Sequence, residues 1–597
     1  MTFENVPSLT RLFFDQAQRQ AAQPFLWHKK AGAWASQSYG SVAADIRRLA
    51  TGLAALGVQP GDRVALISEN RPEWLIADLA IMSLGGISVP AFATNTVEDN
   101  RHVLTHSGAK GLIISNGAIA KRVLPAALQA PELRFLISME GLELAQRLPI
   151  DAYDWQGAMA AGKVVSDEEV DRRIDASRRE DVCCFIYTSG TGGVPKGVML
   201  THGSILCNMQ GAYKLLQEVG LRSETFLSFL PLSHSYEHTA GQFLPISIGA
   251  QIYYAESVEK LVENMAEVRP TIMTAVPRLY EAVHQKILRG LKSAKPLQKR
   301  LFDLTLQLGR KRYEQRGSLP FKERVLDLIC DVTVRRKVRA RFGGRLKAFV
   351  SGGAALNYEI GVFFLSLGVR LLQGYGQTEC SPVITCNRPN SVRIDTVGPV
   401  FDGLDVKIAE DGEILVRGEA VMKGYWRDEE ATAKVIREGW LHTGDIGEFD
   451  ADGNLKITDR KKDIIVLSGG DNVSPARIEG FLLLQPEIGQ AMAHGDKHPH
   501  LVALIVPDPD FAAEWARQHN AEADPVALST NAAFQKAIGQ AVDRVNAGQS
   551  AIERIRRFAV LPEGFTIDNA MLTPSLKIRR HKIRERWGSI LERLYEK

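Results

Sequence analysis

Cysteine is scarce in this sequence. The 597-residue chain has 6 cysteines, two of them adjacent at Cys183 and Cys184, and none belongs to a C-x-x-C pair. Scattered cysteines do not form a disulfide framework or a zinc–thiolate site, and they are typical of a reducing cytoplasm. The cysteine pattern therefore excludes a small disulfide-stapled protein and predicts a cytoplasmic location.

Long hydrophobic runs and a leader sequence are also missing. Residues 1–14 lack the basic region, the apolar core and the small-residue cleavage site of a signal peptide. The best candidate for a membrane span, residues 74–92, contains Asp78, two glycines and Pro90, so it predicts a buried helix followed by a strand. The chain is too long for one core, and we expect a large domain with at least one smaller one.

A Walker A loop is absent too, although one segment resembles it. Residues 187–198 read YTSGTGGVPKGV, with hydroxyl side chains, four glycines and Lys196. The pattern G-x-x-x-x-G-K-[ST] requires glycine before the lysine and a hydroxyl after it, but Pro195 and Gly197 occupy these positions. The segment therefore predicts a phosphate-binding loop of another kind, with a flexible surface turn as the alternative.

Short apolar strands alternate with helical patterns over the first 280 residues. Proline at its first turn predicts a helix over residues 72–84, and Thr201 is expected to cap a helix that starts near His202. The expected strands are residues 63–68, 87–92, 111–115, 134–138, 183–188, 225–230, 251–255 and 271–276. This alternation predicts a layered α/β domain.

The charge is nearly balanced overall but unevenly distributed. The chain carries 73 Lys and Arg against 69 Asp and Glu, a net charge of +4. Residues 285–345 hold eighteen basic and five acidic residues, a net charge of +13, which leaves −9 for the rest. This mainly helical insert is either a solvated surface or a site for anionic lipid headgroups or a polyanionic cosubstrate. We expect no nucleic acid partner, because no recognition-helix or aromatic-interleaved pattern accompanies the charge.

A second pair of glycine-rich turns follows the insert. Open α/β sheets bind ligands at the ends of such strands. There Tyr375 is suited to stacking on a flat ring, Thr378 to contacting a phosphate and Glu379 to holding a divalent cation. The strands are expected at residues 345–350, before SGGAAL (351–356), and 369–372, before QGYGQTE (373–379).

Residues 438–475 carry a third motif, EGWLHTGDIGEFDADGNLKITDRKKDIIVLSGGDNVSP. Together with YTSGTGGVPKG and GYGQTE, in this order, it resembles the AMP-forming acyl-CoA synthetases. Their family of adenylate-forming enzymes also includes firefly luciferase and nonribosomal peptide adenylation domains. The stretch GWLHTGDIG followed by DRKK is similar to the fatty acyl-CoA synthetase signature. Because several motifs occur in the family's order over nearly the whole chain, chance is a poor explanation.

The resemblance implies an α/β fold with two domains. The large N-terminal adenylate-forming domain is expected over residues 1–458, with layered α/β subdomains and a small β-rich subdomain. A hinge at residues 459–463, with Lys462 at the pivot, joins it to a smaller mobile α+β domain over residues 464–597. In the family's scheme that domain first presents Lys577 and then, after rotation, a face at Gly469 and Gly470 to CoA.

The resemblance also implies individual roles. In the first half-reaction, the expected catalytic residues are Lys577, His234, Thr378 and Lys196, with His234 beside the carboxylate substrate. Many relatives have glycine before the adenylation lysine, where this chain has Leu576. Glu379 and Thr188 are expected to hold Mg²⁺, and Asp445, assisted by Arg460, to bind the ribose hydroxyls. The expected ATP-binding residues are Thr188, Ser189, Gly190, Thr191, Gly192, Gly193, Lys196, Gly353, Ala354, Ala355, Gly374, Tyr375, Gly376, Thr378, Asp445 and Arg460.

His234 has two competing interpretations. With Glu237 and His238 it spells H-x-x-E-H, the inverted zinc-peptidase motif. That motif requires both histidines on one face of a helix and a further acidic ligand, and Pro231 lies just upstream. An ordinary buried, hydrogen-bonded histidine is the other alternative.

The expected reaction is the two-step activation of a fatty acid, with ATP, Mg²⁺ and CoA. The fatty acyl signature and the large insert favour a long-chain acid. One alternative is an adenylate-forming ligase for another carboxylic acid or for a carrier-protein acceptor. Another is a non-catalytic nucleotide-binding protein at a membrane, which rests only on the basic insert. Peripheral association with the cytoplasmic face of an anionic membrane remains open in each case.

Overall fold

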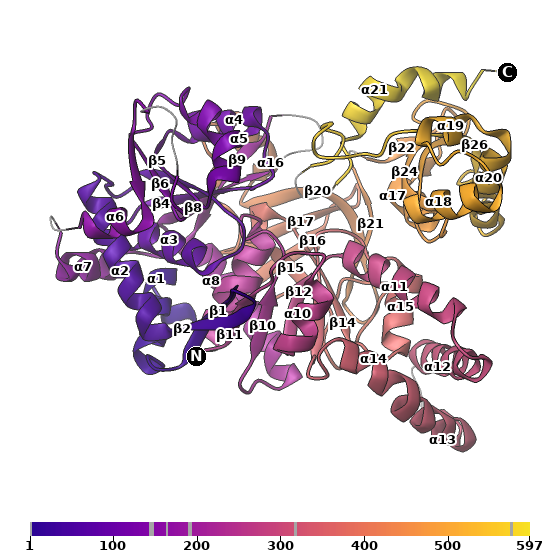
Figure 1. The fold of residues 1–597 in the computed structure, drawn as a ribbon, viewed down its shortest axis with the longest axis horizontal. Coiled ribbons are helices and arrows are strands. Elements are labelled where there is room, and N and C mark those ends of the chain that lie inside the picture. The colour runs from indigo at the N-terminus through magenta and orange to yellow at the C-terminus, as the bar shows by residue number, and fades with distance from the viewer. Residues whose placement is uncertain are drawn as a thin grey trace.

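The computed structural model describes residues 3–142, 148–162, 165–188, 194–315, 319–461, 463–573 and 577–596. Figure 1 shows a large N-terminal body and a smaller C-terminal domain at the upper right. The mixed α/β class predicted from the sequence is confirmed. Among the described helices, none is long and apolar enough to cross a membrane.

The first eight-stranded sheet has the order β18-β9-β8-β4-β3-β5-β6-β7, and β4, β3, β5, β6, β7 and β8 run parallel. Its strands are β3 (Arg63–Ile67), β4 (Ile87–Ala91), β5 (Ala109–Ile114), β6 (Phe135–Ser138), β7 (Asp151–Asp154), β8 (Val182–Thr188), β9 (Lys196–Thr201) and β18 (Gly424–Tyr425). The helices of this part are α2 (Tyr39–Ala55), α3 (Pro72–Ser83), α4 (Val97–Ser107), α5 (Gly117–Ala127), α6 (Trp155–Ala160) and α7 (Asp167–Ala176).

The second eight-stranded sheet has the order β15-β14-β13-β12-β10-β11-β1-β2, with antiparallel strands only at its two edges. Its strands are β1 (Pro24–Lys30), β2 (Ala33–Ser38), β10 (Thr225–Ser228), β11 (Gln251–Tyr254), β12 (Ile272–Ala275), β13 (Ala348–Ser351), β14 (Leu371–Gly376) and β15 (Val383–Cys386). The helices around it are η1 (Phe3–Asn5), α1 (Leu9–Arg19), α8 (His202–Val219), η2 (Glu237–Phe243), α9 (Leu244–Ser247), α10 (Leu261–Val268), α15 (Tyr358–Ser366) and η4 (Thr378–Cys380).

The basic segment lies between β12 and β13 and is helical, as predicted. It consists of α11 (Pro277–Lys292), α12 (Pro296–Glu314), α13 (Phe321–Cys330), η3 (Asp331–Arg335) and α14 (Arg336–Arg341). In Figure 1, α12 and α13 project from the lower right edge of the molecule.

A small β-rich sheet and the C-terminal domain complete the chain. The sheet contains β16 (Leu404–Ile408), β17 (Glu413–Gly418), β19 (Ile436–Arg437), β20 (Trp440–Phe449) and β21 (Leu455–Arg460), with α16 (Glu429–Val435) beside it. The C-terminal domain contains β22 (Ile465–Val466), β23 (Asn472–Val473), α17 (Pro475–Leu482), β24 (Ile488–His494), β25 (Leu501–Pro507), α18 (Pro509–Gln518), α19 (Pro525–Thr530), α20 (Ala532–Ala547), β26 (Ile555–Val560) and α21 (Arg580–Arg593).

Most predicted elements lie within two residues of their observed bounds, but β14 needs a correction. The sequence predicted a strand over residues 369–372 followed by a glycine-rich turn. Instead, the strand runs through the glycines to Gly376, because β15 returns antiparallel beside it. A Cβ at Gly376 would lie 1.8 Å from the carbonyl oxygen of Pro382, so only glycine permits this close approach.

Helix α3 joins the two sheets through the core. Its residues are buried all round, and it contacts β3 and β4 of one sheet and β1 of the other. Of its two carboxylates, Glu73 and Asp78, only Asp78 is fully buried, and its Oδ2 lies 2.8 Å from Nε2 of His238 in η2. Burial alone would lower the pKa of His238, but the Asp78 carboxylate outweighs burial and raises it above the ordinary imidazole value. A buried ion pair thus links α3 to η2.

Replacing Asp78 with asparagine tests this link. The change leaves His238 without its counter-charge in the core, and breaking one partner of a buried pair costs about 3–5 kcal/mol. We therefore expect a large fall in the thermal midpoint of Asp78→Asn. The matched control is Asp175→Asn, because the exposed Asp175 pairs with Arg11 at the surface, where a pair contributes less than about 1 kcal/mol. Equal midpoints for the two variants would contradict the assignment.

The same pair predicts a pH dependence. Because the pKa of His238 is raised by folding, the pair stabilises fully below the unfolded imidazole pKa of about 6.5 and loses this contribution as the pH rises through the folded value. The thermal midpoint of the wild-type protein should therefore fall towards alkaline pH. This fall should be much weaker in Asp78→Asn, and equal slopes in the two proteins would refute the argument.

Candidate active site

Two glycine-rich segments meet at the carboxyl edge of the second sheet. Strands β13 and β14 are parallel neighbours, with Ser351 opposite Gln373. Gly353, Ala354 and Ala355 therefore follow β13 beside the β14 residues Gly374 to Gly376, as the sequence predicted. Gly353 has a φ of +82°, a conformation that favours glycine. The two segments form an open, partly exposed platform of backbone groups.

A buried carboxylate lies next to this platform. The hydroxyl of Tyr375 donates to Asp445 Oδ2 at 2.7 Å, and Nε of Arg460 lies 3.2 Å from Asp445 Oδ1. The backbone sets the second contact, because Asp445 on β20 is opposite Arg460 on β21. Burial and the adjacent carboxylate raise the pKa of the Tyr375 phenol, which keeps it a hydrogen-bond donor. The structure thus brings Tyr375, Asp445 and Arg460 together.

Lys196 and Glu379 lie on either side of a tyrosine. Lys196 is opposite Thr188 in the β8–β9 pair, and its ammonium lies 4.8 Å from the ring centroid of Tyr425 and 3.6 Å from Asp428. The hydroxyl of Tyr425 donates to Glu379 Oε1 at 2.9 Å. A cation and a half-buried carboxylate therefore border one surface, which suits a phosphate that carries a divalent cation. Ser189, Gly190, Thr191, Gly192 and Gly193 lie outside the described residues.

Thr378 and His234 both have hydrogen-bond partners in the segment 234–236. The hydroxyl of Thr378 is 3.0 Å from that of Ser235, and Nδ1 of His234 accepts the backbone N–H of Tyr236 at 3.2 Å. Burial, and then the charge of Lys577, lower the pKa of His234 to about 4. The imidazole is therefore neutral at physiological pH and can donate a hydrogen bond to an anionic substrate through Nε2.

Lys577 reaches this site from the C-terminal domain. Burial and the charge of Arg460 lower its pKa to about 8, against the opposing effects of Asp445 and Glu379. These charges act on the amine because the segment before α21 extends back to the N-terminal body near β20 (Figure 1). Reciprocal backbone and side-chain hydrogen bonds with Thr573, 2.8 and 3.0 Å long, hold the backbone of Lys577. The domain arrangement therefore brings an ammonium group to the buried carboxylate.

The glycines predicted to face CoA lie in a turn of the C-terminal domain. Gly469 and Gly470 form an exposed turn between β22 and β23, where the N–H of Gly470 bonds back to Leu467. Lys462 lies outside the described residues, directly after β21 and Lys461. The charges of Arg460, Asp445 and Glu379 thus act on Lys577, whereas the Gly469–Gly470 turn is exposed.

The H-x-x-E-H sequence does not form a ligand set. Nε2 of His238 is bonded to Asp78, and the carboxylate of Glu237 accepts the hydroxyls of Ser228 and Thr274, at 2.6 and 2.5 Å. These partners occupy the atoms that a zinc ion would need. His234 points to different neighbours, so the alternative of a zinc peptidase is not supported.

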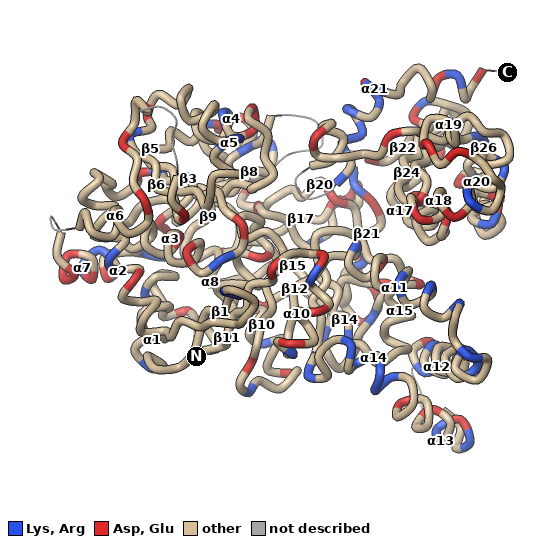
Figure 2. Tube along the Cα trace, in the orientation of Figure 1, with Lys and Arg blue, Asp and Glu red and all other residues tan. Residues whose placement is uncertain are grey.

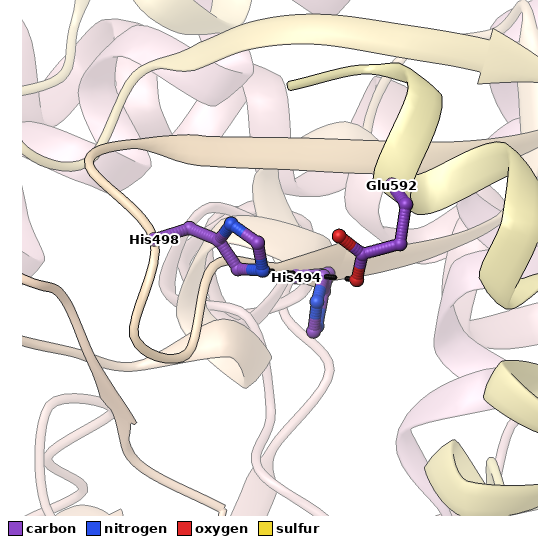
Figure 3. Close-up of side chains that lie close together, drawn as sticks. All are labelled: His494, His498 and Glu592. Carbon is purple, nitrogen blue, oxygen red and sulfur yellow. Dashed lines mark ion pairs between the residues drawn. The ribbon is translucent and has the colours of Figure 1, made fainter. Parts of the chain in front are cut away.

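One cluster of metal-capable side chains does occur among the described residues, in the C-terminal domain (Figure 3). His494, His498 and Glu592 place ligand atoms within 4.8 Å of one another. Their arrangement is explained without a metal, since His498 stacks on Tyr595 at 3.8 Å and pairs with Glu592 at 3.8 Å. Burial, and then the charges of His498 and Arg584, lower the pKa of His494. The cluster fastens α21 to the β24–β25 hairpin.

Sequence reasoning missed Tyr425, Asp428 and Ser235. Tyr425 and Asp428 belong to the short stretch GYWRD, and its place beside Lys196 depends on the pairing of β18 with β9, more than two hundred residues apart. Ser235 adjoins His234, so its position next to a predicted site residue was the only available signal.

Comparisons with known proteins agree with this geometry. A profile described as AMP-binding enzyme matches residues 13–426, and one described as AMP-binding enzyme C-terminal domain matches residues 462–597. The chain is 36% identical over 573 residues to the Mycobacterium tuberculosis long-chain-fatty-acid–CoA ligase FadD15, covering 95% of this chain and 93% of the relative. It is 29% identical to the peroxisomal long chain acyl-CoA synthetase 7 of Arabidopsis thaliana, covering 94% and 82%.

Solved structures share the fold at lower identity. The adenylation domain of a carboxylic acid reductase from Segniliparus rugosus, in complex with AMP and a co-purified carboxylic acid, has a TM-score of 0.75 at 20% identity, covering 98% of this chain and 94% of that one. The O-succinylbenzoate coenzyme A synthetase of Bacillus subtilis, with ATP and magnesium, has a TM-score of 0.67 at 20% identity, covering 96% and 99%.

The backbone platform, the buried carboxylate and the two profile matches define an adenylate-forming enzyme, and the chain belongs to the AMP-binding enzyme family. Both relatives named above, which match this chain over most of their length, are named as enzymes that join long-chain fatty acids to CoA. The resemblance stated from the sequence motifs is thereby confirmed.

Proposed function

We propose that the chain is a long-chain fatty acid:CoA ligase that forms AMP. The observation that carries this proposal is the similarity to long-chain-fatty-acid–CoA ligases over nearly the full length of both chains. The position of Lys577 near Arg460, Asp445 and Glu379 supports it. An ammonium group at this place can stabilise negative charge that develops on a phosphate during the reaction.

The nucleotide is held by groups on three elements. The Asp445 carboxylate accepts the ribose hydroxyls, and Tyr375 and Arg460 orient it. The adenine lies on the platform formed by Gly353–Ala355 and Gly374–Gly376, and Lys196 attracts the outer phosphates. Thr378 contacts the α-phosphate.

The residues present also suit Mg²⁺. Glu379 and Thr188 provide oxygen ligands, and Tyr425 occupies one carboxylate oxygen of Glu379 and so orients the other. When bound, the ion neutralises charge on the departing pyrophosphate. The role of the protein is to place these oxygens beside Lys196.

In the first half-reaction a carboxylate oxygen of the fatty acid attacks the α-phosphorus of ATP, and the bond to pyrophosphate breaks. His234 is neutral and donates a hydrogen bond to the incoming carboxylate, and the Lys577 ammonium stabilises the negative charge around the α-phosphate. In the second, the CoA thiolate attacks the acyl carbonyl and AMP leaves. Rotation about Lys462 withdraws Lys577 and presents the Gly469–Gly470 turn to the pantetheine arm.

The substrate class is tested by measuring AMP formation with palmitate, octanoate, benzoate and acetate, each with and without CoA. We expect CoA-dependent AMP formation with palmitate as the best substrate. AMP with only short or aromatic acids would retain the chemistry but overturn the long-chain assignment. Activity that requires a carrier protein instead of CoA would overturn the acceptor. ATP binding without AMP from any acid would favour the non-catalytic alternative.

Removing the amine of Lys577 should separate the half-reactions. Lys577→Ala should slow adenylate formation by about 10²-fold or more, because one preorganised charge is lost. Thioester formation from supplied acyl adenylate should stay near the wild-type rate. Lys582→Ala, on the exposed face of α21, is the matched control for a lysine in the same segment. Equal losses in both half-reactions would contradict the assigned role.

The lowered pKa of Lys577 predicts the pH profile of the first step. The amine acts in its charged form, so kcat/KM for adenylation should fall as the pH rises through about 8. Lys577→Arg retains its charge at this pH, and any activity it keeps should lack the alkaline fall. Pyrophosphate exchange measured across this range checks both profiles, and a shared fall would assign it to another group.

The hinge is tested at Lys462. Proline fixes φ and removes a backbone donor, so Lys462→Pro should spare adenylation and slow thioester formation by about tenfold or more. Lys461→Ala is the neighbouring control, because it removes side-chain ion pairs with Asp411 and Glu413 but does not restrict φ. An unchanged second half-reaction in Lys462→Pro would refute a pivot at this residue.

We propose further that the enzyme works at the surface of an anionic membrane. Its long-chain substrate partitions into bilayers. Residues 285–345 carry a net charge of +13, which attracts anionic lipids, whereas the rest of the chain is acidic. Figure 2 shows this basic charge on α11 to α14, at one corner of the molecule.

A further inference from the structure

Helix α13 has its acidic side chains on the inner face and large apolar side chains on the outer face. On the inner face, Glu323 pairs with Lys311 of α12 at 2.7 Å, and Asp327 pairs with Arg312 of α12 at 3.2 Å. The buried Arg335 of η3 also binds Asp327 and donates to the backbone of Ser366. Ion pairs thus attach the helix to the body of the protein.

The outer face carries an apolar stripe of five residues. They recur at the spacing of one helix face, continue from α13 into η3, and are strongly exposed. The stripe consists of Phe321 (80% exposed), Val325 (47%), Leu328 (65%), Ile329 (45%) and Val332 (55%). Exposing so many large apolar side chains together is costly in water and marks an interaction surface.

Cations border the apolar stripe. Helical spacing places Lys322 and Arg324 on its two sides, and Arg336 and Lys337 follow its C-terminal end. All four are exposed, and in the part of the chain that the structure describes none lies within ion-pair distance of a carboxylate. The stripe is therefore an apolar centre with a cationic border.

A second copy of the chain does not suit this surface. A two-fold contact between apolar stripes brings Lys322 and Arg324 against the same cations of the other copy. The nearest acidic side chains, Glu323 and Asp327, are already paired on the inner face. An anionic lipid surface matches both features, because it offers hydrocarbon in the centre and phosphates around it.

We propose that α13 is a membrane-docking helix that lies in the interface of an anionic phospholipid bilayer. The apolar stripe inserts among the acyl chains, while Lys322, Arg324, Arg336 and Lys337 contact lipid phosphates. The inner ion pairs keep the helix attached to α12 during insertion. This docking rests on the proposed function for its purpose, which is to take a long-chain acid directly from the membrane.

Vesicle partition tests the apolar stripe. The full chain is mixed with vesicles of phosphatidylcholine and phosphatidylglycerol, or of phosphatidylcholine alone, and bound protein is measured by flotation. We expect binding to the anionic vesicles that weakens as salt is raised. Leu328→Ser should lower the partition about tenfold, since one inserted leucine is lost. Leu128→Ser is the matched control, an exposed leucine after α5, at the far side of the molecule from α13 in Figure 1.

Removing two of the bordering cations tests their contact with lipid phosphates. Lys322→Gln with Lys337→Gln should weaken anionic vesicle binding by about fivefold for each cation removed. The control, Lys121→Gln with Arg122→Gln on α5, removes the same charge elsewhere and should leave binding nearly unchanged. Similar losses in the two double variants would show that binding depends on net charge alone and would overturn docking through α13.

Insertion is read out with a fluorophore. All six native cysteines are buried, so a thiol-reactive, environment-sensitive dye is directed to Val325→Cys. Its emission should shift to the blue on anionic vesicles, and an unshifted spectrum would overturn insertion. Sedimentation tests the remaining alternative, a dimer formed through the apolar stripe. A wild-type dimer that Leu328→Ser converts to a monomer would make the stripe a subunit interface and refute the proposal.

Activity separates this inference from the proposed function. Acyl-CoA formation with dissolved fatty acid, without vesicles, should be the same in the wild type and in all α13 variants, whose thermal midpoints should also be unchanged. Normal activity without vesicle binding would overturn docking alone. Normal vesicle binding without acyl-CoA formation would overturn the enzymatic assignment and leave docking supported.

Discussion

The carboxylate of Asp445 is the interaction on which the site depends. It lies at the point where β20 of the small sheet meets β14 of the large one, and Tyr375 and Arg460 bind its two oxygens from opposite sides. Arg460 is the last residue of β21, immediately before the C-terminal domain. The Lys577 ammonium, from the far end of that domain, feels the same charge. One buried charge therefore connects two sheets, the interdomain junction and the C-terminal lysine.

Burial changes the pKa values of two other groups of the candidate site. Burial lowers the pKa of Lys577 and of His234, and an anion bound beside either group would raise its pKa again. Lys196 differs, since it is half exposed and is positioned by the ring of Tyr425. Desolvation therefore sets the pKa values of Lys577 and His234, whereas strand pairing sets the position of Lys196.

Local sequence patterns predicted those parts whose structure is local. The helix begun by Pro72, the helix capped by Thr201 and the strands around them follow from turn residues and periodicity. Contacts between distant segments did not follow in this way: the pairing of β18 with β9, which places Tyr425, depends on the whole fold. The outward apolar face of α13 also escaped prediction, because a sequence pattern gives the two faces of a helix but not which one is buried.

The contacts between the two domains bear on the proposed rotation of the C-terminal domain. At α11, Arg289 pairs with Asp508 and Asp510 of the C-terminal domain, and Asn357 donates to the carbonyl of Gly480 at 3.4 Å. Exposed ion pairs and a long hydrogen bond contribute little free energy, so these contacts would oppose the proposed rotation only weakly. Because α11 belongs to the same basic segment as α13, a membrane that holds α13 fixes the N-terminal body and leaves the C-terminal domain as the part that moves.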